Sequence, residues 1–183
     1  MRVISGTKRG HILHAPKGQA IRPTSERVRG ALFDILGTAV ADARVLDLFA
    51  GTGALGIEAL SRGAGSALFV DLDKRAVRTI QDNLDRLGLE SCSEVWKTPY
   101  RRALRKLGGQ GCRFDLIFFD PPYEGGWTKN VLYDLMETEV VAEEGIVIAE
   151  HWKKTPTPEP PPRLSLLTER TYGETKISIW RVS

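Results

Sequence analysis

The residues best suited to chemistry are Asp120-Pro121-Pro122-Tyr123, which follow the most apolar stretch of the chain, residues 114–119. Two successive prolines fix the backbone and remove two N–H donors. What remains is the Asp120 carboxylate, the Pro121 carbonyl and the Tyr123 ring, which form an acceptor-rich pocket with a stacking surface. Such a pocket fits an exocyclic amine as the nucleophile.

The amine of a nucleobase is a poor nucleophile because its lone pair is delocalised into the ring. Asp120 and the Pro121 carbonyl can accept its two hydrogens, which aims the lone pair at a sulfonium methyl group. Tyr123 would stack on a base taken out of its helix, and most of the catalysis would come from positioning. The alternative is that these residues form only the turn that ends a strand.

A second segment, residues 45–56 (VLDLFAGTGALG), predicts a buried strand that runs into a glycine-rich turn and opens a helix. Gly51 and Gly53 let the backbone approach a ligand closely, at the edge where open α/β sheets bind ligands. The spacing also fits a dinucleotide fingerprint. Asp47 disfavours that interpretation, because it would repel a pyrophosphate but could bind the α-ammonium group of a methionine moiety. A capping role for Asp47 is the alternative.

Two further polar positions follow predicted strands. Asp71 ends the second strand, where a carboxylate can accept both hydroxyls of a ribose. Asp73 competes for this role, and we interpret it as the N-cap of the next helix. Thr98, after the third strand, could read an adenine amine, although a role as a turn residue is equally compatible with its position.

The periodicity of apolar residues predicts alternating strands and helices, and therefore a parallel sheet covered on both faces. An N-terminal hairpin of residues 2–5 and 11–14 comes first. A helix then starts at Thr24 or Ser25 and stops at Gly37, with Val28, Leu32, Ile35 and Leu36 on its buried face. The expected strands are residues 45–49, 67–70, 94–97, 114–119 and 145–150, followed by an antiparallel pair, 164–167 and 175–180. The expected helices are residues 54–62, 74–87, 101–107 and 130–137.

Composition places the chain among ordinary globular proteins of one domain, with 183 residues, 42% hydrophobic and 27% charged. No apolar run is long enough to span a bilayer and no leader sequence is evident, so a cytoplasmic location is expected. The cysteines, Cys92 and Cys112, and the three histidines show no metal-ligand spacing, and no metal is expected.

The net charge of +3 is unevenly distributed, because residues 1–30 carry +6 and the remainder −3. A basic arm can neutralise phosphates, and a solvated charged surface is the alternative. The candidate RNA-binding residues are Arg2, Lys8, Arg9 and Arg29.

The chain resembles the RsmD family of class I, S-adenosylmethionine-dependent methyltransferases, which act on guanine N2 of 16S ribosomal RNA (guanine-966 type). The resemblance lies in residues 1–8 (MRVISGTK), 22–36 (RPTSERVRGALFDIL), 45–58, 120–123 and 172–177. It implies one domain, with a basic hairpin extension over residues 1–21 and a Rossmann-like core over residues 22–183. The implied core is a seven-stranded, mostly parallel sheet with an antiparallel last strand.

The resemblance also implies roles for individual residues. Arg22, Thr24 and Arg29 would lie near the methionine end of the cofactor or the RNA entrance. Asp47, Gly51 and Gly53 would hold the methionine moiety, Asp71 the ribose, and Asp120 and Tyr123 the target base. Many relatives carry Glu at the position of Asp71 and Asn or Asp near Thr98. The small ribosomal subunit is the implied partner, and a monomer is expected.

Other functions share parts of this pattern. An N6-adenine DNA methyltransferase would use the same acceptor pocket, but such enzymes usually need additional sequence for target recognition. A glutamine-amide methyltransferase of release factors typically has Asn in place of Asp120. A nucleic-acid-binding module without catalysis would leave both chemical motifs unexplained, and Asp47 disfavours a nicotinamide-dependent oxidoreductase.

Overall fold

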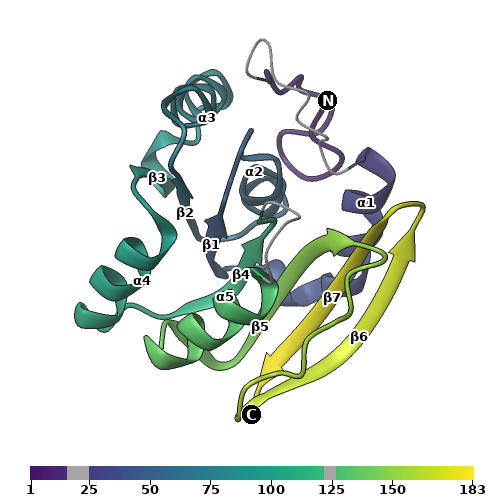
Figure 1. Ribbon diagram of the computed structural model, residues 1–183. Helices are drawn as coiled ribbons and strands as arrows, with labels where there is room; N and C mark the ends of the chain where they lie inside the picture. Colours follow the sequence, from purple (N-terminus) through teal and green to yellow (C-terminus); the bar gives the residue numbers. More distant parts are fainter. Residues whose placement is uncertain (16–24, 122–126) are drawn as a thin grey trace.

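A computed structural model describes residues 1–15, 25–121 and 127–183. Seven strands form one sheet in the order β3-β2-β1-β4-β5-β7-β6 (Figure 1). β7 is antiparallel to both of its neighbours, whereas the other neighbouring pairs are parallel. The bounds are β1 Arg44–Leu48, β2 Ser66–Asp71, β3 Ser93–Lys97, β4 Phe114–Phe119, β5 Val141–Trp152, β6 Leu164–Tyr172 and β7 Thr175–Val182. The predicted mostly parallel sheet that ends in an antiparallel pair is confirmed.

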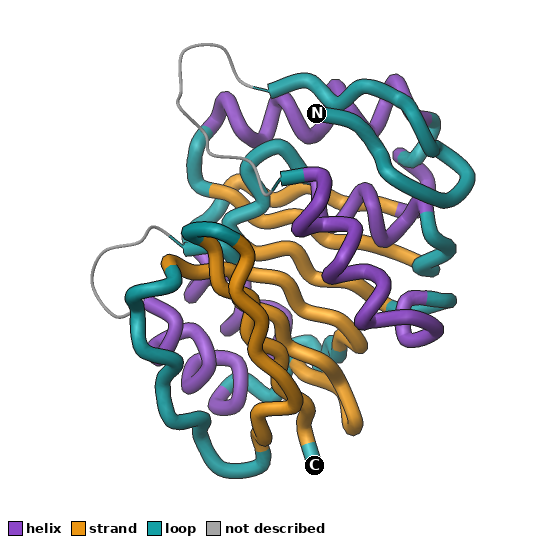
Figure 2. Tube along the Cα trace, turned by 90° about the vertical axis from the view of Figure 1, so that its right-hand side faces the viewer, coloured by secondary structure: helices purple, strands orange, loops and turns teal. Residues whose placement is uncertain are grey.

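Helices cover both faces of this sheet, as Figure 2 shows. One apolar core contains residues of α1, α2 and α3 together with two N-terminal side chains, Val3 and Leu13. The other core contains residues of α4 and α5. The α-helices are α1 Glu26–Leu36, α2 Ala54–Ser61, α3 Lys74–Leu87, α4 Tyr100–Gly109 and α5 Trp127–Glu137, and the short 3-10 helices are η1 Gly37–Val40 and η2 Glu90–Cys92. None of the described helices has the length and apolar character needed to cross a bilayer.

Helix α1 begins and ends where its sequence predicts, but one residue of its buried face differs. Val28 N donates a hydrogen bond of 3.2 Å to Ser25 Oγ, which caps the helix. Gly37 ends it with a φ of 52°. Ile35 is exposed, and Phe33 is buried in its place. The prediction for Ile35 was wrong because Phe33 packs against Phe118 of β4, which rotates the buried face toward that ring.

The N-terminal residues do not form the predicted hairpin of strands. They make a single antiparallel bridge, between Arg2 and Ile12. Ile4 N and Ser5 N instead donate hydrogen bonds of 2.8 and 3.0 Å to the carboxylate of Glu58 in α2. Val3 N still donates a 2.9 Å hydrogen bond to the backbone oxygen of His11. Because only alternate N–H groups face the partner strand, Ser5 N would come next in this ladder; Glu58 accepts it instead, so the pairing stops after one bridge. We call residues 1–15 the N-terminal arm.

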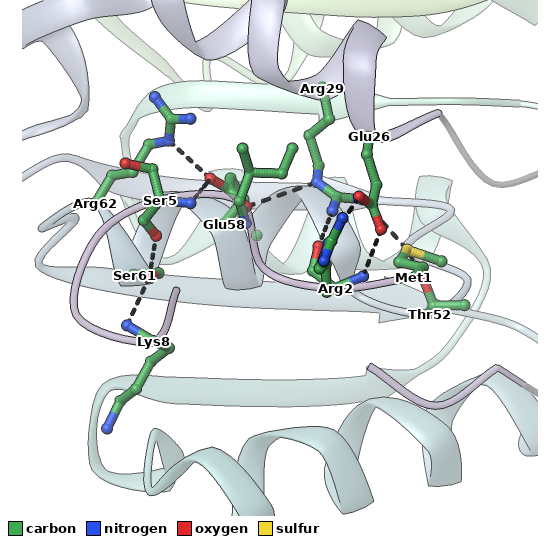
Figure 3. Close-up of polar contacts among 12 residues, drawn as sticks. Met1, Arg2, Ser5, Lys8, Glu26, Arg29, Thr52, Glu58, Ser61 and Arg62 are labelled. Carbon is green, nitrogen blue, oxygen red and sulfur yellow. Dashed lines mark hydrogen bonds and ion pairs between the residues drawn. The ribbon is translucent and has the colours of Figure 1, made fainter. Parts of the chain in front are cut away.

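Glu58 is the centre of the contacts that hold the N-terminal arm (Figure 3). Its side chain is 1% exposed, and besides the two backbone amides it contacts two arginines. Glu58 Oε2 lies 3.6 Å from Arg29 Nε, and Oε1 accepts a 2.8 Å hydrogen bond from Arg62 Nε. Arg29 is itself fully buried and donates to the backbone oxygen of Arg2. The arm is therefore fixed to α1 and α2 through one buried carboxylate.

We expect Glu58→Gln to lower the free energy of unfolding by about 3 kcal/mol, because it leaves the buried Arg29 charge without its counter-charge. Urea unfolding measures this loss. Glu143→Gln, at an exposed position, removes the same charge and should change stability by less than about 0.5 kcal/mol. Equal stability of the two variants would contradict the role of Glu58.

Candidate active site

The candidate site lies at the carboxyl ends of β1, β2, β4 and β5. From β1 the chain proceeds to β2 and β3 on one side and later to β4 and β5 on the other. The strand order thus reverses beside β1, and ligands bind in the crevice at such a switch point. The glycine-rich turn after β1 and Asp120 after β4 are therefore brought to the same edge.

The strand register places four carboxylates on one face of the sheet. Asp47 pairs with Phe69 of β2 and with Phe118 of β4. Asp71 and Asp120 lie two residues beyond these partners, and Glu150 lies two beyond Ile148, which also pairs with Phe118. Side chains alternate along a strand, so all four carboxylates face the side covered by α1, α2 and α3.

The turn after β1 has the left-handed backbone that its glycines predict. The φ angles are 59° at Phe49, 58° at Gly51 and 75° at Gly53. A Cβ added at Gly53 would lie 3.3 Å from side-chain atoms of Ile57, Ile80 and Phe69. At Gly56 an added Cβ would lie only 2.3 Å from the Phe69 ring, so glycine permits α2 to pack closely on β2.

Asp71 is held by the backbone on both carboxylate oxygens. Gly51 N donates to Oδ2 and Asp73 N donates to Oδ1, each at 2.9 Å. These bonds orient the carboxylate next to the glycine-rich turn, and its remaining lone pairs can accept ribose hydroxyls. The interpretation of Asp73 as an N-cap is confirmed, because its Oδ1 accepts a 2.8 Å hydrogen bond from Arg75 N.

Asp47 lies beneath this turn and is 3% exposed. Its Oδ2 accepts a 3.0 Å hydrogen bond from Gly56 N in the first turn of α2. The pKa of Asp47 is raised to about 8, chiefly by burial; the hydrogen bond from Gly56 lowers it, and the negative charge of Asp71 raises it. The capping role is thus present, and the second carboxylate oxygen remains suited to a cation.

Asp120 shares this electrostatic environment. Burial raises the pKa of its carboxyl well above the ordinary value, and the negative charges of Glu150 and Asp47 add to the effect. Pro121, the next residue, is buried. Carboxylates so placed favour a positively charged or hydrogen-bond-donating ligand, because such a ligand compensates their mutual repulsion.

The remaining predicted residues differ in how the structure places them. Thr98 is half-buried, and its backbone N donates a 3.1 Å hydrogen bond to the Asp71 carbonyl oxygen. Its contact with adenine stays a prediction. Arg22, Thr24 and Tyr123 lie outside the described residues.

The basic candidates of the N-terminal region divide into exposed and buried side chains. Arg9 is exposed, as is Arg2, whose Nε donates a 3.0 Å hydrogen bond to Glu26. The backbone N of Lys8 donates to Ser61 Oγ, at 3.0 Å. Arg29 is fully buried against Glu58 and has no surface to offer RNA, so the prediction that it binds RNA is corrected. Its counter-charge, Glu58, lies 29 positions further along the chain, and the sequence pattern does not indicate a pair at that distance.

Sequence reasoning missed two buried polar residues beside the site. Asn83 Oδ1 accepts from His14 N at 2.8 Å, and its Nδ2 donates to the oxygens of His14 and Thr52 at 3.1 and 3.2 Å. Asn83 thereby joins the N-terminal arm to the glycine-rich turn. Glu150 is 4% exposed beside Asp120. The sequence does hold a signal for each residue: Asn83 is a polar residue on the apolar face of a helix, and Glu150 is a polar residue at the end of an apolar strand.

Three aromatic rings cluster on the other face of the sheet, near the same strand ends. The Phe49 centroid lies 5.2 Å from that of Tyr100 and 6.1 Å from that of Trp127. Tyr100 and Trp127 are 5.9 Å apart. Because Phe49 begins the glycine-rich turn, this packing fixes the turn to α4 and α5.

Comparison with known proteins matches residues 1–181 to the family described as Conserved hypothetical protein 95. Bacillus subtilis YlbH is 39% identical over 99% of this chain and 98% of its own length. Ribosomal RNA small subunit methyltransferase D of Escherichia coli is 32% identical over 99% of this chain and 89% of its own length. The solved structure of Escherichia coli YhhF has a TM-score of 0.89 at 31% identity and covers 100% of this chain and 98% of its own.

We expect Asp47→Asn to change the pH dependence of stability. The folded-state pKa of about 8 lies above the ordinary 3.8, so the stability that this proton contributes is complete at low pH and is lost as pH rises from about 4 to about 8. The asparagine variant lacks this loss. Each pH unit in this window removes about 1.4 kcal/mol from the stability of the wild type, and a domain of this size shifts by about 2–4 °C per kcal/mol. The melting temperature of the variant should therefore rise relative to that of the wild type by roughly 7–15 °C between about pH 5 and 8.

The matched control is Asp82→Asn, which removes an exposed carboxylate of α3. Its melting temperature should follow that of the wild type at every pH. A constant difference between Asp47→Asn and the wild type would contradict the raised pKa of Asp47.

Proposed function

Since this chain belongs to the Conserved hypothetical protein 95 family, the family of RsmD-type methyltransferases, we propose that it methylates the exocyclic N2 amine of a guanine in 16S ribosomal RNA (guanine-966 type). The methyl donor is S-adenosylmethionine. The relative named ribosomal RNA small subunit methyltransferase D supports the ribosomal substrate.

The observation that carries this proposal is the position of Asp120 and Pro121. They follow β4, which pairs directly with β1, and β1 leads into the glycine-rich turn. The acceptors proposed for the amine therefore adjoin the turn that would hold the methyl donor. The short separation between adjacent strands, about 4.8 Å, suits the transfer of a single carbon.

The residues around the turn fit S-adenosylmethionine. Gly51 and Gly53 allow close approach of the methionine moiety, and Asp47 lies where its ammonium group would be favoured. Asp71, already oriented by two backbone amides, would accept the ribose hydroxyls, and Thr98 would lie at the adenine. Arg22 and Thr24 are proposed at the methionine end or the RNA entrance, on the family resemblance alone.

Asp120 and the Pro121 carbonyl would hold the two hydrogens of the amine and direct its lone pair, while Tyr123 stacks on the base. Bound S-adenosylmethionine supplies an electrophilic methyl group on a sulfonium. Attack by the amine would break the bond between the methyl carbon and sulfur and release S-adenosylhomocysteine. The nitrogen would then carry a positive charge and be strongly acidic, so its proton would pass to the Asp120 carboxylate after the transfer, and no base is needed to deprotonate the amine in advance.

Glu150 favours guanine over adenine as the target. Guanine presents its N1–H donor next to the N2 amine, whereas adenine presents an N1 acceptor next to its N6 amine. Asp120 and Glu150 lie at the ends of adjacent strands, so one carboxylate could accept from the N2 amine of guanine and the other from its N1–H. The same pair would repel the N1 lone pair of adenine. The exposed Arg2 and Arg9 and the half-buried Lys8 would contact RNA phosphates.

The experiment that tests this function is methyl transfer from labelled S-adenosylmethionine to undermethylated small ribosomal subunits, naked 16S RNA and duplex DNA. We expect N2-methylguanine on a ribosomal substrate. N6-methyladenine, or label in DNA alone, would overturn the substrate while preserving the amine chemistry.

We expect Asp120→Ala to reduce kcat by at least about 100-fold, because the amine loses the acceptor that orients it. Binding of S-adenosylhomocysteine, measured by calorimetry, should stay within about twofold of the wild type. The control Asp85→Asn, at an exposed position of α3, should retain full activity. A parallel loss of cofactor binding in Asp120→Ala would refute the assignment of Asp120 to the target amine.

A further inference from the structure

A basic groove lies along the edge of the molecule that carries β3 and α4. It has a volume of about 630 Å³ and is lined by Trp96, Lys97, Thr98, Arg102, Ala103 and Lys106. Three of these six side chains are cationic and none is acidic. We call this the α4 groove; α4 and β3 are at the left of Figure 1, across the sheet from β6 and β7.

The charge of the α4 groove belongs to a longer basic segment. Residues 97–113 contain six cationic side chains and no acidic one. Arg101 and Arg113 are neutralised by Asp134 and Glu139, at 2.9 and 3.1 Å. Lys97 and Arg102 form no ion pair with any acidic residue in the described ranges. Arg105 and Lys106 form none in these ranges either. Three of these four unpaired cations, Lys97, Arg102 and Lys106, line the α4 groove, and Arg105 lines the groove on the other side of α4.

The ammonium group of Lys106 is held in place by an aromatic ring. Its Nζ lies 4.1 Å from the centroid of the Trp96 ring. Trp96 is oriented in turn, because its Nε1 donates a 3.1 Å hydrogen bond to Glu94 Oε2. A lysine ordered in this way loses less side-chain entropy when it contacts an anion.

A second groove, on the other side of α4, has the opposite character. It lies between α4 and α5, and three acidic residues line it, Asp134, Glu137 and Glu139. These carboxylates offset Arg101 and Arg105 in the same lining. Of these two grooves, the one lined by Lys97, Arg102 and Lys106 is therefore suited to a polyanion.

The α4 groove opens beside the candidate active site. Thr98, in its lining, donates its backbone N–H to the carbonyl oxygen of Asp71 at 3.1 Å. The N-terminal arm packs on the opposite face of the sheet, with α1, α2 and α3. Two cationic surfaces thus flank the crevice, and an RNA that reaches Asp120 can contact both.

We propose that the α4 groove binds the phosphate backbone of the RNA substrate, through Lys97, Arg102 and Lys106. This inference rests on the proposed function for the identity of the polyanion. Phosphate contacts position an RNA without reading its sequence. The groove would therefore set affinity and orientation, while Asp120 and its neighbours select the base.

The test measures the affinity for undermethylated small ribosomal subunits and for naked 16S RNA between about 50 and 200 mM salt. Arg102→Glu and Lys106→Glu should each weaken binding several-fold and lower the slope of log K against log salt by about 1. The KM for RNA should rise, with kcat unchanged at saturating RNA. The control Arg170→Glu, an exposed position on β6, should bind as the wild type does.

Two further measurements distinguish the possible failures. Calorimetric binding of S-adenosylhomocysteine should be unchanged in all variants, which confirms that they are folded. Trp96→Ala should weaken RNA binding and Trp96→Phe should restore most of it, because an aromatic ring again orders Lys106. If Arg102→Glu and Lys106→Glu kept the salt slope of the wild type, the α4 groove would not bind RNA phosphates, and the proposed activity would be unaffected. If the wild type bound RNA without methylating it, the proposed activity would be wrong, and the role of the groove in RNA binding would stand.

Discussion

The parallel register of β1 with β2 and β4 is the constraint on which the site depends. Asp47 pairs with Phe69 and Phe118, so the residues two positions beyond these rings, Asp71 and Asp120, project on the same face as Asp47. A shift of one residue in either pairing would turn one carboxylate toward α4 and α5. The apolar residues on both faces of the central strands hold this register, because any slip would expose them or bury polar groups.

The same register concentrates negative charge in a region from which water is largely excluded. Burial is the largest contribution to the raised pKa of both Asp47 and Asp120, and mutual repulsion adds to it. A site of this kind is stabilised by a ligand that brings positive charge and N–H donors. A sulfonium cofactor with an ammonium group and an amine substrate meet both requirements, which connects the electrostatics to the proposed chemistry.

The N-terminal arm links the stability of the fold to the site. Glu58 fixes it to α1 and α2 through backbone amides and arginines, and Asn83 joins it to the glycine-rich turn. Part of the basic charge of the first thirty residues is therefore structural, since Arg29 is buried and pairs with Glu58. The surface available to RNA comprises the exposed side chains of the arm and, on our inference, the α4 groove.

The sequence by itself determined the features that depend on local chemistry. The glycine-rich turn, the N-caps at Ser25 and Asp73 and the strand-ending positions of Asp71 and Asp120 follow from residue type and short spacing, which control backbone conformation directly. Only the tertiary structure decided which distant groups meet. Glu58 accepts the backbone N–H of Ser5 that the predicted hairpin required, Arg29 becomes its buried partner, and Glu150 comes to lie beside Asp120. These pairings depend on how the helices pack against the sheet, and that packing cannot be predicted from the spacing of residues along the chain.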